Sequence, residues 1–165
     1  MNDPFPLTEA LVVLLVKDTF SDLRHTSFGA QNIVPKWTGQ AVGSMFEPLF
    51  LYRLQRIQPF TWRGGKQKSE KDVVHLGTPS LSFEIKTSSS KNKIVGNKSS
   101  TKEGKVKHKD RDGYLLAVNY DISSLEPTLI RVGTLTDDDW SGQKSETGQC
   151  AVVRNSTNMT TIYSS

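Results

Sequence analysis

The spacing of apolar residues changes near residue 72, and this change restricts the possible folds more than any other feature of the chain. Between residues 7 and 57, apolar side chains recur every three or four positions, which is the period of an α-helix. Beyond residue 72 they fall into short runs separated by turn-forming residues, as in β-strands. Helical segments followed by a series of strands predict an α/β fold in which helices pack on a central β-sheet.

Two helices are expected in the first third of the chain. One covers Leu7–Arg24 and follows Pro6, a residue that is common at the start of a helix. The other covers about Gly39–Ile57, where Pro48 predicts a kink or a late start. Residues 25–36 and 61–71 are polar and contain glycine or proline, so both stretches are predicted to be loops.

The strands are expected in the remaining two thirds. The turn sequence Gly77-Thr78-Pro79-Ser80 separates the first two and predicts that they form a hairpin. The predicted strands are Asp72–Leu76, Leu81–Ser88, Gly113–Asp121 and Thr128–Leu135, followed by two shorter ones at Ala151–Arg154 and Met159–Tyr163.

Size and cysteine content favour one cytoplasmic domain. With 165 residues the chain is large enough to bury a core, so residues 1–165 are expected to form a single domain. Cys150 is the only cysteine, which excludes an internal disulfide and is typical of a reducing cytoplasm. The longest apolar run, Ala10–Val16, is too short to span a bilayer, and the chain opens without the basic residues of a signal peptide.

Positive charge is concentrated in one segment, between Lys86 and Arg111. This segment holds nine basic and two acidic residues, a net charge of +7, whereas the whole chain carries only +4. A basic stretch beside a mildly acidic body is typical of a protein that binds nucleic acid, and less often of one that binds a membrane surface. The alternative is a solvated, lysine-rich loop.

The strand Leu81–Ser88 carries the residues with the clearest chemical potential. Its side chains alternate, so Leu81, Phe83 and Ile85 are expected to face the core. Glu84 and Lys86 then lie side by side on the opposite face. Asp72 begins the preceding strand of the hairpin, and its carboxylate is expected opposite Glu84. Two carboxylates on adjacent strands form an oxygen-rich site for a hard cation.

A lysine beside such a site can hold or deprotonate an attacking water and offset the charge that grows on a phosphorane. These groups are what phosphodiester hydrolysis requires. The alternative is a structural ion pair, because the seven Glu and fourteen Lys of the chain give roughly 0.6 Glu-x-Lys matches by chance. Glu103-Gly104-Lys105 is such a match, but no alternating strand surrounds it. Glu84 is distinguished by its strand, by Asp72 and by the basic segment that follows.

Two sets of residues resemble a known family. Asp72 followed by Phe83-Glu84-Ile85-Lys86 resembles the PD-(D/E)XK nuclease signature, although Lys71 stands where that signature has proline. More specifically, Glu84-Ile-Lys-Thr-Ser, Ile94-Val-Gly-Asn-Lys-Ser99, the segment Ile130–Lys144 and Thr147-Gly-Gln149 are similar to type II restriction endonucleases of the ScaI-like group.

The resemblance implies a fold, a cofactor and a set of ligands. It implies a restriction-endonuclease-like α/β core with a mixed central β-sheet flanked by helices, Mg²⁺ as cofactor, and products with 5′-phosphate ends. Asp72, Glu84 and Lys86 are then catalytic, and Asp72 and Glu84 bind the metal. A glutamate from a preceding helix often completes the metal shell in this superfamily, which implies Glu47 as an accessory ligand ahead of Glu9. Alternatively, Glu47 is an ordinary solvent-facing helix residue.

Residues for contacts with double-stranded DNA are expected after the catalytic strand. Lys91, Lys93 and Lys98 are the candidates for binding phosphates, and Asn97 and Ser99 for reaching base edges. In the second resembling segment, Trp140, Gln143 and Lys144 are expected to contribute to a recognition or dimer surface.

Other candidate sites are weaker. Asp137-Asp138-Asp139 suggests a metal site, but a solvated turn or a helix cap is the more common role of such a run. The three histidines and Cys150 lack zinc-ligand spacing, and no Walker-type glycine loop for ATP is present.

The sequence therefore leads to two main hypotheses. The first is a type II restriction endonuclease that cuts DNA at a specific sequence as a homodimer or with a second subunit. Its variants are a cleavage subunit of a heteromeric restriction enzyme and another PD-(D/E)XK nuclease. The second hypothesis is a non-enzymatic DNA-binding module, and the combination of Asp72, Glu84 and Lys86 favours the enzyme.

Overall fold

A computed structural model of the chain describes residues 4–28, 37–67, 69–97, 112–142 and 150–165. Its two helices are α1 (Glu9–Phe28) and α2 (Gly39–Ile57). Its strands are β1 (Trp62–Gly64), β2 (Val73–His75), β3 (Phe83–Ser88), β4 (Val95–Asn97), β5 (Gly113–Asp121), β6 (Glu126–Leu135), β7 (Trp140–Gly142), β8 (Cys150–Val153) and β9 (Met159–Ser164). Single 3₁₀ turns, η1 (Pro79–Leu81) and η3 (Asp137–Asp139), precede β3 and β7.

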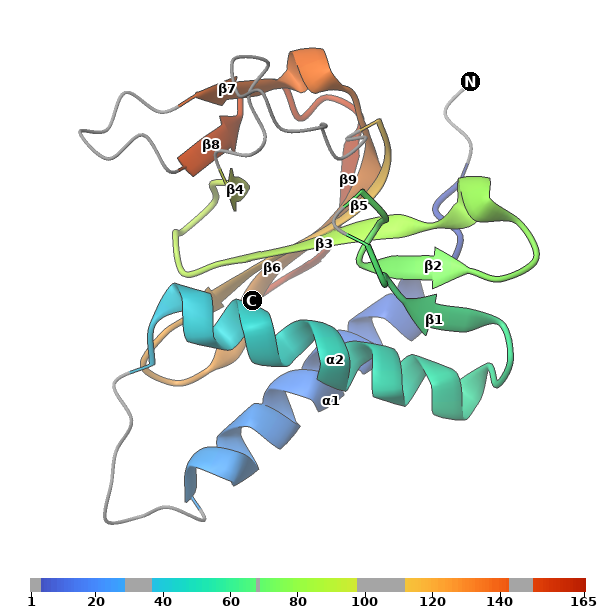
Figure 1. The fold of residues 1–165 in the computed structure, drawn as a ribbon. Helices are drawn as coiled ribbons and strands as arrows, with labels where there is room; N and C mark the ends of the chain where they lie inside the picture. The colour runs from blue at the N-terminus through green and yellow to red at the C-terminus, as the bar shows by residue number, and fades with distance from the viewer. Residues whose placement is uncertain (1–3, 29–36, 68, 98–111, 143–149) are drawn as a thin grey trace.

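The strands form two sheets. The larger has the order β1-β2-β3-β5-β6-β9, and the smaller has the order β4-β8-β7. β3 and β5 are parallel and the other neighbours in the larger sheet are antiparallel, so the sheet is mixed. This confirms the predicted α/β class with a mixed central sheet. Figure 1 shows the two helices crossing below the larger sheet, with the smaller sheet at the upper left.

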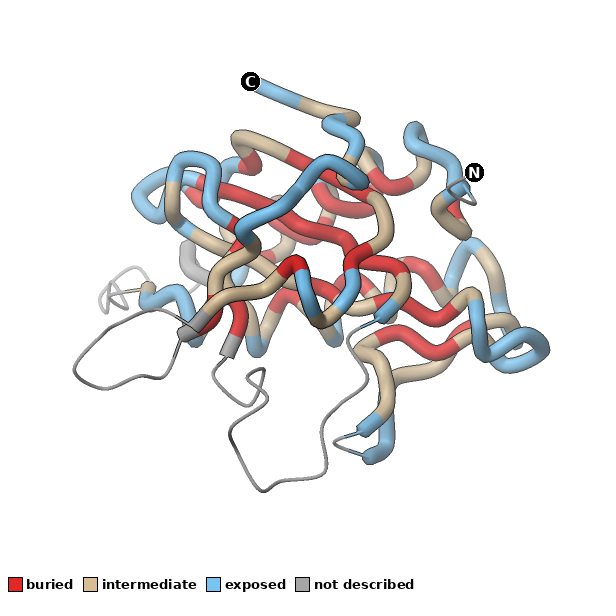
Figure 2. Tube along the Cα trace, turned by 90° about the horizontal axis from the view of Figure 1, so that it is seen from above, coloured by how far each residue is buried: buried red, intermediate tan, exposed pale blue. Residues whose placement is uncertain are grey.

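The central strand β5 has covered side chains on both of its faces. Tyr114, Leu116 and Val118 belong to the main core, which also contains the buried residues of α1 and α2. Leu115 and Ala117 belong to a second cluster, which includes Ile94 and Leu135 and packs near the smaller sheet. The sequence of a strand that is covered on both faces is typically a nearly continuous run of apolar residues, as in β5. Figure 2 shows these buried central strands surrounded by exposed loops.

The helices were largely predicted from the sequence. α2 has the predicted bounds, and Thr38 caps it by accepting a hydrogen bond from the backbone N–H of Ala41 at 3.1 Å. It continues through Pro48, so the prediction of a late start is wrong. α1 extends four residues beyond the predicted Arg24. Neither helix in the described part of the chain is long and apolar enough to cross a membrane.

An ion-pair network joins the two helices. Arg53 of α2 donates to Asp22 at 2.6 Å and to Asp18 at 2.9 Å, and both acids belong to α1. The hydrogen bond that Asp22 accepts from Arg53 lowers the pKa of Asp22. α2 also lies close to β3, because Gly43 has no side chain: a Cβ there would come within 3.2 Å of Thr87 Oγ1.

The strand predictions were accurate for the longer strands. β5 has the predicted bounds, and β2, β3, β6, β8 and β9 lie within two residues of their predicted positions. The predicted hairpin is present as the antiparallel pair of β2 and β3. Leu81 is part of η1 instead of β3, and it packs against the core while half-buried. β1 lies inside the stretch that was predicted to be a loop, and β4 and β7 were not predicted.

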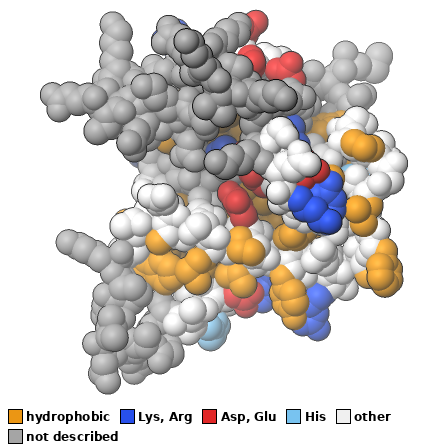
Figure 3. Space-filling view, in the orientation of Figure 1, with side chains coloured by type: hydrophobic (Ala, Val, Ile, Leu, Met, Phe, Trp, Pro, Cys, Tyr) orange, Lys and Arg blue, Asp and Glu red, His pale blue; other side chains and the backbone are white. Residues whose placement is uncertain are grey.

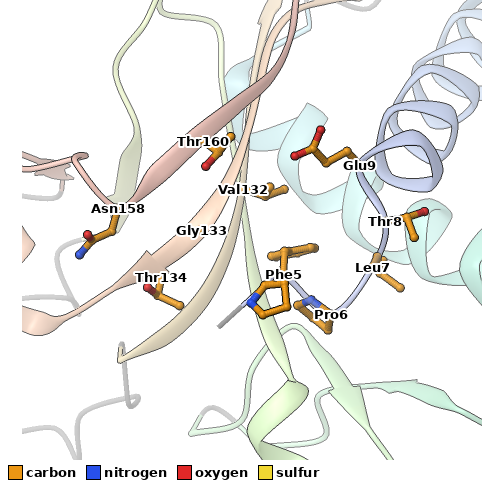
Figure 4. A pocket seen from close by; sticks show the side chains of 11 residues that line it. Phe5, Pro6, Leu7, Thr8, Glu9, Val132, Gly133, Thr134, Asn158 and Thr160 are labelled. Atoms are coloured by element: carbon orange, nitrogen blue, oxygen red, sulfur yellow. The ribbon is translucent and has the colours of Figure 1, made fainter. Parts of the chain in front are cut away.

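The N-terminal segment closes one side of the main core. Phe5 packs against Phe83 with ring centroids 5.1 Å apart, and against Tyr114 at 5.8 Å. A cavity of about 430 Å³ lies between this segment and strands β6 and β9 (Figure 4). It is lined by short polar and apolar side chains and by the start of α1, and none of Asp72, Glu84 and Lys86 borders it.

Candidate active site

Strand β3 presents two charged side chains away from the core. Phe83 and Ile85 are buried, with 0% and 1% of their surface exposed, so they fix which face of the strand is internal. Glu84 and Lys86 alternate with them and keep 15% and 22% of their side-chain surface exposed. The alternation therefore places these two residues next to each other on the outer face, as expected from the sequence.

Asp72 joins this pair from the other strand of the hairpin. It immediately precedes β2, and its Oδ2 accepts a hydrogen bond from the backbone N–H of Ile85 at 2.9 Å. A carboxylate that accepts a backbone N–H across a hairpin is held in one place. The Asp72 carboxylate thus lies next to the part of β3 that carries Glu84 and Lys86. Only 14% of the Asp72 side chain is exposed.

The ammonium group of Lys86 contacts both carboxylates. Its Nζ lies 3.5 Å from Asp72 Oδ2 and donates a hydrogen bond to Glu84 Oε1. It also donates to the carbonyl oxygen of Ile85 at 2.9 Å. One cationic nitrogen is therefore shared by two carboxylates from neighbouring strands.

The charges around Lys86 determine its protonation. Burial alone lowers the pKa of Lys86, because removal from water disfavours the charged form. The negative charges of Asp72 and Glu84, with a smaller effect from Glu47, outweigh burial and raise the pKa above its ordinary value. In the absence of a bound cation, Lys86 is therefore a protonated counter-ion for the acidic residues around it.

Glu47 approaches the same site from α2. Gly43 faces Thr87 of β3, and Glu47 lies one helical turn later on the same side of the helix. Glu47 and Asp72 both border a cavity of about 450 Å³ that is also lined by residues 64–67, 70 and 71. Figure 3 shows the molecule in the orientation of Figure 1. Acidic side chains lie near the middle of the face in view, beside basic ones and above the hydrophobic side chains along α2.

Carboxylate groups such as those of Asp72 and Glu84 are suitable ligands for a hard divalent cation. Asp72 and Glu84 already share one cationic group, and carboxylate oxygens are the ligands that Mg²⁺ prefers, with water and phosphate completing its shell. Among the described residues, no three His, Cys, Asp or Glu side chains form a ready-made metal cluster. The site thus offers two close carboxylates, with Glu47 on the wall of the adjoining cavity.

Glu70, another acid on this cavity, is engaged elsewhere. It forms a two-pronged ion pair with Arg63, at 2.6 and 3.1 Å, and accepts hydrogen bonds from the backbone of the loop. The hydrogen bond from Arg63 is the main reason that its pKa falls to about 2. Glu70 therefore shapes the cavity wall by fixing the loop. The sequence offered no signal for this pair, because the two residues belong to a stretch predicted as an irregular loop.

The predicted DNA-contacting residues are only partly described. Lys91 and Lys93 are exposed on the segment that joins β3 to β4. Asn97 is the last residue of β4 and pairs with Cys150 of β8. Four more candidates lie outside the described residues, namely Lys98, Ser99, Gln143 and Lys144, together with most of the basic segment.

The aspartate run caps a turn. Asp139 Oδ2 accepts hydrogen bonds from the backbone N–H of Thr136 at 2.8 Å and from its hydroxyl at 3.0 Å, which forms a capping box around η3. This confirms the cap interpretation of the run. Trp140 follows in β7 and packs, half-buried, against the second core cluster.

Two buried polar residues were missed by the sequence analysis. Asn119 in β5 and Arg131 in β6 have exposed fractions of only 1% and 9%. Each interrupts a run of apolar residues within its strand, and that interruption is the signal the sequence contains. They contact the segment that follows β3, within hydrogen-bonding distance of its backbone.

Comparison with known proteins agrees with these observations. A type II restriction enzyme, ScaI of Streptomyces caespitosus, is 40% identical over 119 residues, covering 68% of this chain and 52% of that protein. The chain thus spans about half the length of this relative. No solved structure matches this chain. The sequence model of the ScaI restriction endonuclease family matches residues 2–163, nearly the whole sequence, and the chain therefore belongs to that family.

Proposed function

We propose that this chain is a type II restriction endonuclease that uses Mg²⁺ to hydrolyse double-stranded DNA at a specific sequence, leaving 5′-phosphate ends. The observation that carries the proposal is the meeting of Asp72 and Glu84 at the ammonium group of Lys86. Membership of the ScaI restriction endonuclease family supports it. We also propose a cytoplasmic location, as expected from the sequence.

The restriction endonuclease family implies a divalent metal cofactor, and the acidic residues supply the groups to hold it. Asp72 and Glu84 would be ligands, and Glu47 would be an accessory ligand from α2. When bound, Mg²⁺ supplies a Lewis acid that lowers the pKa of a water molecule and neutralises the phosphate. The backbone N–H of Ile85 fixes the Asp72 carboxylate, so that the two carboxylates stay close enough to share one cation.

Lys86 contributes a positive charge at the point where the substrate phosphate would enter. Its amino group is held by the carbonyl oxygen of Ile85 as well as by the carboxylates, so its position is defined. From there it can orient the attacking water and stabilise the negative charge that develops on the phosphorane. The cavity bordered by Glu47 and Asp72 would admit the DNA backbone beside the Asp72 carboxylate.

The proposed reaction requires two active sites for a double-strand break. One active site of this kind cuts one strand, and a palindromic DNA site matches a two-fold symmetric protein. The proposal therefore includes a homodimer or a second restriction subunit. Lys91, Lys93, Asn97, Lys98 and Ser99 are proposed to contact DNA after β3, and Gln143 and Lys144 to extend that surface.

Incubation of the purified protein with Mg²⁺ and a plasmid of known sequence tests the proposal. Discrete fragments whose ends map to one sequence and carry 5′-phosphates are the expected result. Nicked circles alone would mean that the chain cuts a single strand and needs a further subunit. An intact plasmid over a range of metals and salt concentrations, from a protein that binds DNA, would contradict the enzyme and favour the non-enzymatic DNA-binding module.

A further inference from the structure

The segment that follows β3 is held by a buried asparagine. Asn119 lies opposite Ser88, the last residue of β3, in the parallel pair of β3 and β5. Its Nδ2 donates hydrogen bonds to the carbonyl oxygens of Ser90 at 2.8 Å and Lys93 at 3.0 Å. One side-chain amide therefore fixes both ends of residues 90–93, which we call loop 90–93.

A buried arginine orients this asparagine and adds a third attachment. Arg131 Nη2 donates to Asn119 Oδ1 at 2.7 Å and to the carbonyl oxygen of Asn92 at 3.0 Å. Because Asn119 Oδ1 accepts from Arg131, its NH₂ group must point toward loop 90–93. Ser90 completes the arrangement, since its hydroxyl accepts from the backbone N–H of Lys93 at 3.0 Å.

Burying the charged side chain of Arg131 at this position has a cost in folding free energy. Burial lowers its pKa, and its Nε is buried with no hydrogen-bond partner among the described residues. None of the ion pairs formed among the residues that the structure describes includes Arg131. An apolar residue would avoid the cost of a buried charge, so stability alone does not account for Arg131.

The loop that these two residues hold carries two exposed cations. The side chains of Lys91 and Lys93 are exposed. The carbonyl oxygens of Ser90, Asn92 and Lys93 accept hydrogen bonds from the buried side chains of Asn119 and Arg131. The loop continues directly from the strand that bears Glu84 and Lys86. A fixed backbone therefore sets where the two lysines stand relative to these residues.

We propose that Asn119 and Arg131 are positioning residues, which hold loop 90–93 so that Lys91 and Lys93 bind the phosphate backbone of duplex DNA next to the bond that is cut. This inference rests on the proposed function. Because the loop is already ordered before DNA binds, less conformational entropy is lost on binding. The DNA affinity is therefore expected to be higher. Asn119 and Arg131 contact only the protein, and they act through the lysines.

Replacement of Asn119 by aspartate separates the loop from the core. In Asn119→Asp, an acceptor for Arg131 remains and gains charge, but the donors to Ser90 and Lys93 are lost. Asn158→Asp adds the same charge at an exposed position on the cavity beside β9 and serves as the matched control. Arg131→Lys is a second test variant, which keeps the charge and loses the guanidinium fork.

Limited trypsin digestion of the folded proteins measures the state of the loop. Trypsin cuts after lysine, so cleavage after Lys91 and Lys93, mapped by mass spectrometry, reports local opening of loop 90–93. We expect at least about tenfold faster cleavage at these two sites in Asn119→Asp and Arg131→Lys than in the wild type, with Asn158→Asp unchanged. Equal rates in all the variants that fold would overturn the inference.

A double-mutant cycle measures whether the positioning acts through the lysines. The pair Lys91→Gln and Lys93→Gln should weaken DNA binding about tenfold or more in the wild type, and much less in Asn119→Asp, because the loop is already released there. KM should rise in Asn119→Asp while kcat stays nearly constant. Fully additive losses would mean that Asn119 supports the fold and does not position these lysines.

The two experiments also separate this inference from the proposed function. A wild-type protein that neither binds nor cuts DNA would contradict the proposed function, and the trypsin result would still show whether Asn119 and Arg131 hold the loop. A wild-type protein that binds and cuts DNA, with additive losses in the cycle, would contradict only the inference.

Discussion

At the scale of single residues, Lys86 is the counter-ion on which the acidic site depends. Its ammonium group contacts Asp72 and Glu84, and both carboxylates are mostly shielded from water. Without it, two negative charges would face each other across the hairpin, which is unfavourable unless another cation neutralises them. Under the proposed function, Lys86 and a divalent cation would therefore compete for the same two carboxylates.

This competition predicts how metal stabilises the variants. Mg²⁺ should raise the Tm of the wild type, raise that of Lys86→Met by more, and have little effect on Glu84→Gln, because ligand binding to the folded state stabilises it. Thermal unfolding with and without Mg²⁺ measures the three shifts, and Lys17→Met is the control for loss of a lysine elsewhere. Equal shifts in Glu84→Gln and the wild type would show that Glu84 is not a ligand.

The sequence predicted some of the residues in this region and missed others for a physical reason. Glu84 and Lys86 were predictable because Phe83 and Ile85 fix the register of β3. Asn119 was not, because its role depends on the path of loop 90–93, and a polar residue in an apolar strand does not reveal its partner. The same limit applies to Glu70, whose partner Arg63 lies in a stretch with no periodicity.

At the scale of secondary-structure elements, the hairpin of β2 and β3 depends on Asp72. These strands share a single described ladder pair, Val73 with Phe83. The hydrogen bond from the backbone N–H of Ile85 to Asp72 therefore contributes to the register of the hairpin. Asp72 has a structural role in addition to its proposed role as a metal ligand.

Two substitutions separate the structural role from the chemical one. Asp72→Asn keeps an oxygen that can accept from Ile85, so its free energy of unfolding should stay close to that of the wild type while cleavage is lost. Asp72→Ala loses the acceptor as well and should be less stable by about 1–3 kcal/mol. Urea unfolding measured beside plasmid cleavage tests both. Equal stability of the two variants would show that the hydrogen bond is unimportant, and cleavage by Asp72→Asn would remove Asp72 from the catalytic set.

Element length and flanking turn sequences together determined which parts of the fold were predictable. α2, β5 and β6 are long enough to show a clear period or a continuous apolar run, and their positions were predicted within two residues. β1, β4 and β7 have three residues each, which is too short to show alternation. Such strands form because neighbouring strands provide hydrogen-bonding partners, and the partner of β4, strand β8, is distant in sequence.

At the scale of the whole molecule, charge is separated along the chain. The segment Lys86–Arg111 carries +7 within a protein of net charge +4, so the remainder is acidic. Among the described residues of this segment, Lys91 and Lys93 are the exposed basic side chains, and they lie shortly after β3. Under the proposed function, this positive charge would attract the DNA backbone, while the carboxylates beside Lys86 would remain available to a cation.

This distribution predicts how DNA affinity responds to salt. Contacts with phosphates release counter-ions, so affinity should fall steeply as salt rises. The pair Lys91→Gln and Lys93→Gln should reduce the slope of log affinity against log salt by about 2, whereas Lys17→Gln on α1 should leave it unchanged. Fluorescence anisotropy over a range of salt concentrations measures these slopes. An unchanged slope in the pair would mean that loop 90–93 is a solvated loop and that DNA binds elsewhere.

The central claim is that Asp72, Glu84 and Lys86 act as one catalytic unit on DNA. Single-turnover cleavage of a plasmid in Mg²⁺, by the wild type, Glu84→Gln, Lys86→Met and their double variant, tests this claim most directly, with DNA binding measured in Ca²⁺ to show that each protein still engages its substrate. Each single variant should cut at least about 100-fold more slowly, and the double variant should be little worse than either, because groups that act together give non-additive losses. Cleavage near the wild-type rate by either folded single variant would contradict the account.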